Sequence, residues 1–170
     1  MPSKTEIKQL SHSEYESKSQ HKEIIVACDD VKGPANIGAL FRICDAFGIN
    51  KIIFNSPINI TSPRLKKTAR NTEKNTPYES KEAFIPYIAN LKATGYCVIA
   101  VELTSKSISV DQWKSPSNKM VVILGNEATG VSEEILGMAD DTIHISMFGE
   151  NSSLNVATAA GIVLHEISKS

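Results

Sequence analysis

The chain has 170 residues, of which 41% are hydrophobic and 22% charged, with a formal net charge of −1. These fractions are those of an ordinary globular domain and exclude disordered and collagen-like classes. No apolar run approaches the roughly 18–20 residues that cross a bilayer, and the polar N-terminus lacks the apolar segment of a secretory signal. The three cysteines Cys28, Cys44 and Cys97 lie apart in apolar surroundings. We therefore expect buried thiols and a cytoplasmic protein without a membrane segment.

Strand and helix patterns alternate after a polar arm over residues 1–22. Short, β-branched apolar runs predict buried strands, at residues 24–27, 51–54, 96–103, 120–124 and 142–145. Apolar residues at helical spacing predict helices, at residues 37–47, 83–91, 132–136 and 154–167. This alternation is typical of an α/β fold with a mainly parallel sheet flanked by helices. We expect one domain over residues 23–170.

Several polar residues are expected at the ends of these elements. Ser80 can cap the third helical segment, in which Pro86 predicts a kink or a late start. Ser152 or Ser153 can cap the last helix. The pair Asp29-Asp30 follows the first strand, and we expect both side chains to be solvated.

Three loops carry polar residues at the carboxyl ends of the predicted strands, where ligands bind in parallel α/β sheets. In the first, Gly38 and Arg42 are four residues apart and share the helix face away from the apolar stripe. Arg42 is therefore predicted to point outward, across a glycine that leaves room for another group. For this segment taken alone, an ordinary solvated arginine on a helix surface is the favoured interpretation.

The second loop, residues 124–130, has glycines at both Gly125 and Gly130, which allow close backbone approach. It is neither a phosphate loop nor GxGxxG, and an ordinary turn explains it as well as a ligand loop does. The third loop, residues 148–155, enters the last helix with two serines and Asn155. Helix capping is the more common reason for serine or asparagine at the start of a helix.

Other chemistries lack their motifs. The four histidines do not have metal-ligand spacing, and no serine stands in GxSxG. We expect neither a metal site nor a serine hydrolase.

A basic cluster lies between the second and third predicted strands. Five cations fall within residues 64–74, opposed only by Glu73, and they are Arg64, Lys66, Lys67, Arg70 and Lys74. A chain with a net charge of −1 lacks the strongly basic signature of a nucleic-acid binder, but a local patch can supply phosphate contacts. Arg64, Lys66, Lys67 and Arg70 are our candidates for contacts with an RNA backbone.

Taken together, in order and spacing, the three loops resemble the SpoU (TrmH-like) family of RNA ribose 2′-O-methyltransferases in the SPOUT superfamily. The segments that match are residues 36–48, 123–130 and 145–156, and the likeness runs from about residue 24 to the C-terminus. Ser146 departs from the pattern, because the family usually has proline at that position.

The resemblance implies a SPOUT-type fold whose C-terminal segment threads a trefoil knot. Knots are rare in general, so this expectation rests on the resemblance alone. It also implies a homodimer built partly from the first and last helices. S-adenosylmethionine is implied as the cofactor, held in the knot by backbone groups and close neighbours. The residues implied to bind it are Leu103, Gly125, Ile145, Ser153 and Leu154.

The resemblance also implies that Arg42 is the catalytic arginine, supplied next to the cofactor of the other protomer. Asn36, Glu127 and Asn155 match the other site residues and are expected to orient Arg42 and the substrate. A guanidinium stays protonated at any working pH. We therefore expect Arg42 to orient the ribose hydroxyl and stabilise the developing alkoxide, not to act as a free base.

The implied substrate is a structured RNA. The compact architecture favours tRNA over ribosomal RNA, and neither the nucleotide nor the base follows from the residues. Two alternatives stay open at this point. One is a catalytically silent RNA-binding domain of the same fold, and the other is a flavodoxin-like nucleotide or flavin binder, which the alternating pattern also fits.

Overall fold

The computed structural model describes residues 7–11, 13–17 and 19–169. Within these residues the strands form one sheet in the order β3-β2-β1-β6-β4-β7-β5, and every pair of neighbours is parallel. The strands are β1 (Glu23–Asp29), β2 (Lys51–Phe54), β3 (Tyr78–Ser80), β4 (Cys97–Val101), β5 (Ile108–Ser109), β6 (Lys119–Gly125) and β7 (Asp141–His144). The predicted α/β class with a mainly parallel sheet is confirmed.

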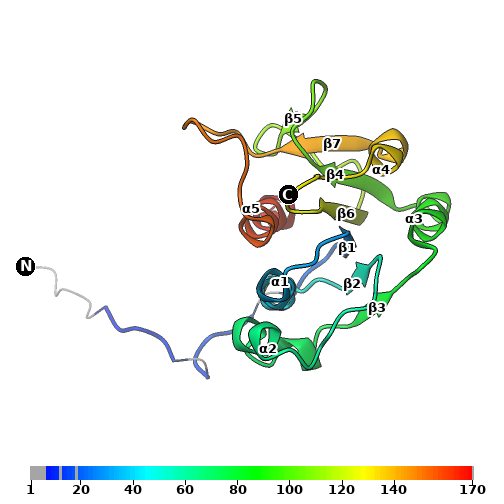
Figure 1. The fold of residues 1–170 in the computed structure, drawn as a ribbon. Helices are drawn as coiled ribbons and strands as arrows, with labels where there is room; N and C mark the ends of the chain where they lie inside the picture. The colour runs from blue at the N-terminus through cyan, green and yellow to red at the C-terminus, as the bar shows by residue number, and fades with distance from the viewer. Residues whose placement is uncertain (1–6, 12, 18, 170) are drawn as a thin grey trace, which may run out of the picture.

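Helices cover both faces of the sheet, as Figure 1 shows. They are α1 (Pro34–Ala46), α2 (Pro63–Ala69), α3 (Phe84–Ala93), α4 (Glu133–Met138) and α5 (Val156–Lys169), with a 3-10 turn η1 (Thr72–Lys74). One apolar core joins the sheet to α1, α2 and α5, and a second core joins it to α3 and α4. Residues 7–11 and 13–17 form an arm that extends away from this body (Figure 1), whereas Gln20 and Lys22 hydrogen-bond to residues of α5.

Strand β1 lies inside the sheet between β2 and β6 and is buried on both faces. Ile24 and Val26 point into the core of α1, α2 and α5, whereas Ile25 and Ala27 point into the core of α3 and α4. A strand buried on both faces needs a continuous apolar run, which is why this run predicts the strand correctly.

All three cysteines are buried and free, as expected. Burial raises the pKa of the Cys97 thiol to about 11 and raises the pKa of Cys44 further. The thiols are therefore un-ionised at neutral pH and serve as small apolar core residues.

Two capping predictions are wrong. Ser80 lies in β3, and α3 begins only at Phe84, so that Pro86 falls in its first turn. The predicted late start of this helix is confirmed. It places Pro86 in the first turn, where a helix tolerates proline. The cap of α5 is Asn155, whose Oδ1 accepts hydrogen bonds from the backbone N–H of Ala157 (3.0 Å) and Thr158 (3.3 Å). Ser152 and Ser153 lie too far ahead of the first helical residue to do this.

The prediction that Asp29 is solvated is also wrong. Asp29 is only 7% exposed, because it still belongs to β1 and pairs in register with Gly125. Its Oδ2 accepts a hydrogen bond from the backbone N–H of Ser132 at 2.8 Å. The carboxylate thus joins the end of β1 to the start of α4. Asp30, the next residue, has φ +65° and pairs with Lys32 at 3.0 Å.

The room that Gly38 leaves is filled by α2. A Cβ atom at this position would lie 2.1 Å from Thr68 Oγ1 and 2.3 Å from the carbonyl oxygen of Leu65. The glycine therefore lets α1 and α2 pack with their backbones close together. Helix α2, which was not predicted, carries most of the basic cluster, so Gly38 sets where that cluster lies relative to α1. The trefoil knot stays a prediction.

Gly38→Ala is expected to destabilise the protein by about 1–3 kcal/mol, because the backbone of α2 must move away. Urea unfolding measures this change. The matched control is Gly137→Ala in α4, where a Cβ meets nothing within 4 Å and alanine suits a helix better than glycine by about 0.5–1 kcal/mol. Equal stability of the two variants would show that the contact with α2 does not constrain this position.

Candidate functional site

A cavity of about 870 Å³ opens at the carboxyl ends of β4, β6 and β7. The loops that follow these strands line it, together with the first turn of α5. All five residues predicted to hold the cofactor line the cavity, and they are Leu103, Gly125, Ile145, Ser153 and Leu154. The sheet therefore brings together side chains that lie up to about 50 residues apart in the chain, because the carboxyl ends of parallel strands meet at one edge.

The backbone around Gly125 is packed against the rest of its own loop. A Cβ at this position would lie 2.3 Å from the carbonyl carbon of Gly130 and 2.3 Å from the nitrogen of Val131. Gly130 has φ +71°, a conformation that side-chain-bearing residues rarely adopt. Both glycines are thus required by the shape of the loop. The loop lines the cavity, and its role in binding a ligand stays a prediction.

Glu102 joins two walls of the cavity, and sequence analysis did not find it. Its Oε1 accepts the backbone N–H of Leu103 at 2.9 Å, and its Oε2 accepts that of Val131 at 3.0 Å. A Cβ at Gly130 would lie 2.3 Å from this same Oε2. A lone glutamate at the end of a strand carries no signal of this role, since the partner that ties it to the other wall, the N–H of Val131, is 29 residues away.

Asn36, Glu127 and Asn155 form a hydrogen-bonded chain at the mouth of the cavity, which all three line. Asn36 Nδ2 donates to Glu127 Oε1 at 2.7 Å, and Asn155 Nδ2 donates to Asn36 Oδ1 at 2.9 Å. Asn36 lies in the first turn of α1, Glu127 in the loop after β6 and Asn155 just before α5. Strands β1 and β6, which lead to the first two, are neighbours in the sheet. The sequence predicted all three as site residues, and the structure brings them together.

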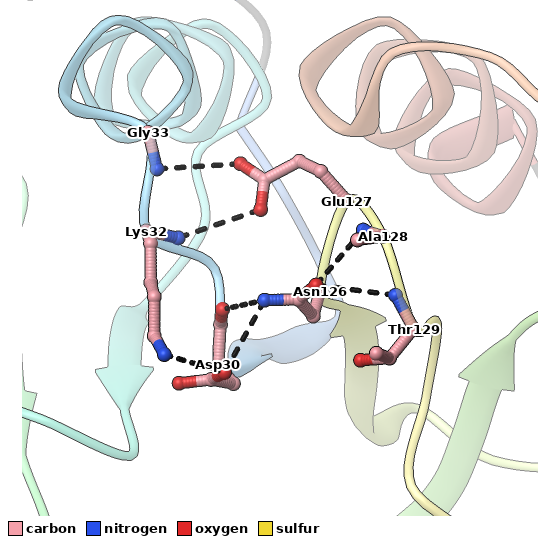
Figure 2. A network of polar contacts seen from close by, with 7 residues as sticks. All are labelled: Asp30, Lys32, Gly33, Asn126, Glu127, Ala128 and Thr129. Carbon is pink, nitrogen blue, oxygen red and sulfur yellow. Dashed lines mark hydrogen bonds and ion pairs between the residues drawn. The ribbon is translucent and has the colours of Figure 1, made fainter.

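The Glu127 carboxylate also binds the start of α1, as Figure 2 shows. Its Oε1 accepts the N–H of Gly33 at 3.3 Å, and its Oε2 that of Lys32 at 3.5 Å. Burial raises the pKa of this carboxyl, but the hydrogen bonds from Asn36 and from these backbone groups outweigh it, and the pKa lies below its usual value. Glu127 is therefore an ionised acceptor at neutral pH.

Asn126 is a second residue that sequence analysis missed. Its Nδ2 donates to the carbonyl of Asp30 at 2.8 Å and to the carboxylate of Asp30 at 3.2 Å, and its Oδ1 accepts the N–H groups of Ala128 and Thr129 (Figure 2). This amide shapes the loop after β6 and ties it to the loop after β1. Glu127, the next residue, is therefore fixed at its backbone by the loop and at its carboxylate by Asn36 and Gly33.

Arg42 is exposed on α1 and does not line the cavity. It lies six residues after Asn36, which is about 9 Å along the helix axis. Within the described residues its guanidinium has no hydrogen bond or ion pair. The prediction that it points outward is confirmed.

The four predicted RNA-contacting residues, Arg64, Lys66, Lys67 and Arg70, are exposed on α2 and at its C-terminal end. Glu73, the one opposing charge, is 93% removed from solvent and does not face outward with them. The cations are therefore free to act together on the surface, next to the helix that carries Arg42.

Ser146 lies in the loop after β7, at the position where the likeness to the SpoU family departs. Its hydroxyl lies 2.7 Å from the hydroxyl of Ser109 in β5. A hydrogen bond thus restrains this loop where a proline ring is usual.

In the described part of the chain, no three His, Cys, Asp or Glu side chains gather as a metal ion requires. Among the same residues, no helix has the length and apolar composition that crossing a membrane needs.

Comparison with known proteins decides the family. The family described as SpoU rRNA methylases matches residues 23–165. The chain belongs to the SpoU family. The resemblance drawn from the three loops is confirmed, and so is the family's fold.

Two relatives illustrate the likeness. The chain is 33% identical over 156 residues to the tRNA (guanosine(18)-2'-O)-methyltransferase of Aquifex aeolicus, which covers 86% of this chain and 69% of that protein. A solved structure of an AdoMet-bound rRNA methyltransferase from Sinorhizobium meliloti superposes with a TM-score of 0.78 at 29% identity, over 88% of this SpoU chain and 57% of that one.

Relatives differ greatly in length. The tRNA (guanosine(18)-2'-O)-methyltransferase of Saccharomyces cerevisiae is 28% identical over 145 residues, and the match covers 84% of this SpoU chain but only 10% of that protein. The likeness therefore concerns one part of that much longer chain.

Proposed function

We propose that the chain transfers a methyl group from S-adenosylmethionine to a ribose 2′-hydroxyl of RNA. The observation that carries this proposal is the juxtaposition of two features. The cavity lined by Gly125, Ile145 and Leu154 opens beside the hydrogen-bonded chain of Asn36, Glu127 and Asn155. Two relatives support the same activity by their names, which are tRNA (guanosine(18)-2'-O)-methyltransferase and AdoMet-bound rRNA methyltransferase.

The cavity fits the proposed cofactor. Its volume of about 870 Å³ lies in the range of ligand pockets. Leu103 is 54% exposed and Leu154 is 40% exposed, and both line the cavity. Exposed leucines in a cavity are covered when an apolar ring enters, and an adenine ring meets that need. Gly125 is half-buried and lines the cavity, so its backbone groups can meet a ligand there.

S-adenosylmethionine supplies a methyl group that its sulfonium already activates. As the ribose oxygen bonds to the methyl carbon, the methyl–sulfur bond would break and the hydroxyl proton would leave to water. The protein has to position this hydroxyl and to stabilise charge on its oxygen. Glu127, held by Asn36 and by the start of α1, provides a fixed acceptor at the cavity mouth. Asn155 and Asn36 fix each other's amide orientation. Arg42 provides a permanent positive charge for the hydroxyl oxygen and a neighbouring phosphate.

Arg42 is proposed to act in a homodimer, at the cavity of the partner. It is exposed, has no partner among the described residues and lies outside the cavity of its own chain. The face of α1 and α5 is also partly apolar at the surface, where Ile43 is half-buried and Ile162 is 37% exposed. A symmetric pairing through these helices covers that surface and brings each Arg42 towards the other chain.

The proposed substrate is a structured RNA, with tRNA favoured, in a reducing cytoplasm that suits three free cysteines. Mapping 2′-O-methyl sites in total RNA with and without the gene tests this, followed by methylation of the mapped RNA by the purified protein. We expect one or a few sites to disappear. Cofactor binding without methyl transfer to any RNA would instead support the silent RNA-binding domain.

Cofactor binding is expected to need no metal. Isothermal titration calorimetry in excess chelator should give the same affinity for S-adenosylmethionine as titration without chelator. The motivation is that no three His, Cys, Asp or Glu side chains of the described residues gather as a metal ion requires. Binding that disappears with the chelator would contradict this proposal.

RNA affinity is expected to fall steeply with salt despite the net charge of −1. If α2 and its flank contact about four phosphates of a single strand, log K should fall with log salt at a slope near −3, about −0.7 per phosphate. Replacing Lys66, Lys67 and Arg70 together by alanine should reduce the slope to about −1 and leave the affinity for S-adenosylmethionine unchanged.

The matched control removes three exposed cations elsewhere, by replacing Lys106, Lys114 and Lys119 with alanine. This variant has the same net charge as the first. The same change of slope in both variants would show that total charge, and not the surface of α2, governs RNA binding.

A further inference from the structure

A second, smaller cavity lies between the site network and the cationic helix. Its volume is about 150 Å³, and a cavity of this size holds a single aromatic ring. Three segments line it, namely the loop after β1 with the first turn of α1, the loop after β2, and α2. None of the residues that line it also lines the cofactor cavity.

Each wall of this cavity belongs to an element that carries part of the proposed site. Lys32 lines the cavity, and its backbone N–H binds Glu127. Ile37 lines it directly after Asn36 in α1. On the opposite wall Leu65 stands in α2 among the exposed cations of the basic cluster. A group in this cavity is therefore adjacent both to the proposed reaction site and to a surface for phosphates.

The cavity has an apolar floor and a polar rim. Ile37 and Leu65 are 5% and 1% exposed. At the rim, Asn59 Oδ1 accepts hydrogen bonds from the backbone N–H (3.1 Å) and the hydroxyl (2.7 Å) of Thr61, which leaves the amide nitrogen free to donate. Within the described residues neither this nitrogen nor the hydroxyl of Ser56 has a hydrogen-bond partner. A flat ring with acceptors on its edge fits this cavity, because its faces contact the apolar floor and its edge accepts hydrogen bonds from the polar rim.

We propose that this cavity is a base pocket, which takes one nucleobase of the RNA substrate within one nucleotide of the methylated ribose. The inference rests on the proposed function. Single-stranded RNA is commonly read by splaying a base out of its stack and bonding its edge. The flanking phosphates then lie against α2, where the charges are complementary. The free donor of Asn59 favours a base that presents a carbonyl oxygen. Methyl transfer itself involves only ribose, so a base pocket is how the protein selects a nucleotide.

The test uses the full chain, S-adenosylmethionine and a short RNA that contains the mapped site. Asn59→Asp keeps the oxygen that binds Thr61 but removes the free donor, and Ser56→Phe fills the pocket. Both variants should reduce kcat/KM for RNA by about 5- to 100-fold, the value of one good base-edge contact. Their affinity for S-adenosylmethionine should match that of the wild type. Asn118→Asp, at an exposed position before β6, makes the same charge change away from the pocket and should have no effect.

Abasic RNAs provide the decisive comparison, because they keep the ribose hydroxyl. Three RNAs each lack one base, at the mapped site or at one of its two neighbours. For the wild-type protein, one of these RNAs should show the same reduction of kcat/KM that the pocket variants show on the intact RNA. On that RNA, Asn59→Asp should cause no further loss, since the two changes remove the same contact.

Additive losses at all three positions, or variants that match the wild type, would overturn the base pocket. If Ser56→Phe loses cofactor affinity as well, it has disturbed the fold, and Asn59→Asp decides alone. If the wild-type protein methylates RNA and both variants do so equally well, the base pocket is wrong and the proposed function still holds. A wild-type protein that methylates no RNA overturns both.

Discussion

Arg42→Ala is expected to reduce single-turnover methyl transfer by about 10²–10³-fold or more, the usual effect of removing a donor aimed at developing negative charge. The same variant should keep its affinity for S-adenosylmethionine, because Arg42 does not line the cavity. Its stability should change by less than about 1 kcal/mol, as for other exposed residues away from the core. Single-turnover kinetics, calorimetry and urea unfolding measure the three quantities on one preparation.

Arg42→Lys tests what the guanidinium contributes beyond its charge. An ammonium group is a point charge and does not present the planar pair of donors that holds a hydroxyl and a phosphate together. We therefore expect little recovery of the rate. Near-wild-type transfer by Arg42→Ala would remove this residue from the mechanism and leave an ordinary solvated arginine.

Gly125→Ala is expected to have the second large effect, a loss of cofactor affinity. The added methyl group would lie 2.3 Å from the backbone of Gly130 and Val131, so the loop must move by about 1 Å. Misplacement on that scale costs about 10²-fold where a site depends on fixed geometry. Calorimetry with S-adenosylmethionine measures the affinity, and unfolding should show a loss of about 1–3 kcal/mol from overpacking.

Gly149→Ala is the matched control, on the loop that closes the same cavity. A Cβ at Gly149 meets nothing within 4 Å, and its backbone is not in the left-handed region. This variant should bind the cofactor as the wild type does. Equal affinities of all three proteins would show that the cofactor lies elsewhere.

The two variants together test whether Arg42 acts across a dimer. An Arg42→Ala chain keeps an intact cavity, and a Gly125→Ala chain keeps an intact arginine. In a two-fold dimer that shares its sites, each mixed dimer has one complete site, so random mixing should restore about a quarter of wild-type activity. A mixture no more active than the separate variants would place Arg42 and the cofactor in the same chain.

The sequence by itself determined the central strands, α1 and the three loops of the site. Strand β1 is surrounded on both faces, and only a continuous apolar run satisfies that environment. Apolar residues at helical spacing predict helix α1. Gly48 predicts where it stops, and this glycine has φ +63° just after the end of the helix. These signals are local. Each depends on the residue's own backbone conformation and on whether its side chain faces the core, and both follow from the pattern of neighbouring residues.

Tertiary structure alone decided how the site is held. Asn126 and Asp30 are 96 residues apart, and Asn155 and Asn36 are 119 apart, yet their side chains are bonded. Strand β5 has two residues and exists only through its pairing with β7. Gly38 is equally compatible with an open groove and with a packed helix until α2 is in place. Contacts of this kind depend on which distant segment packs against a given surface. The spacing of apolar residues within one segment does not predict that partner.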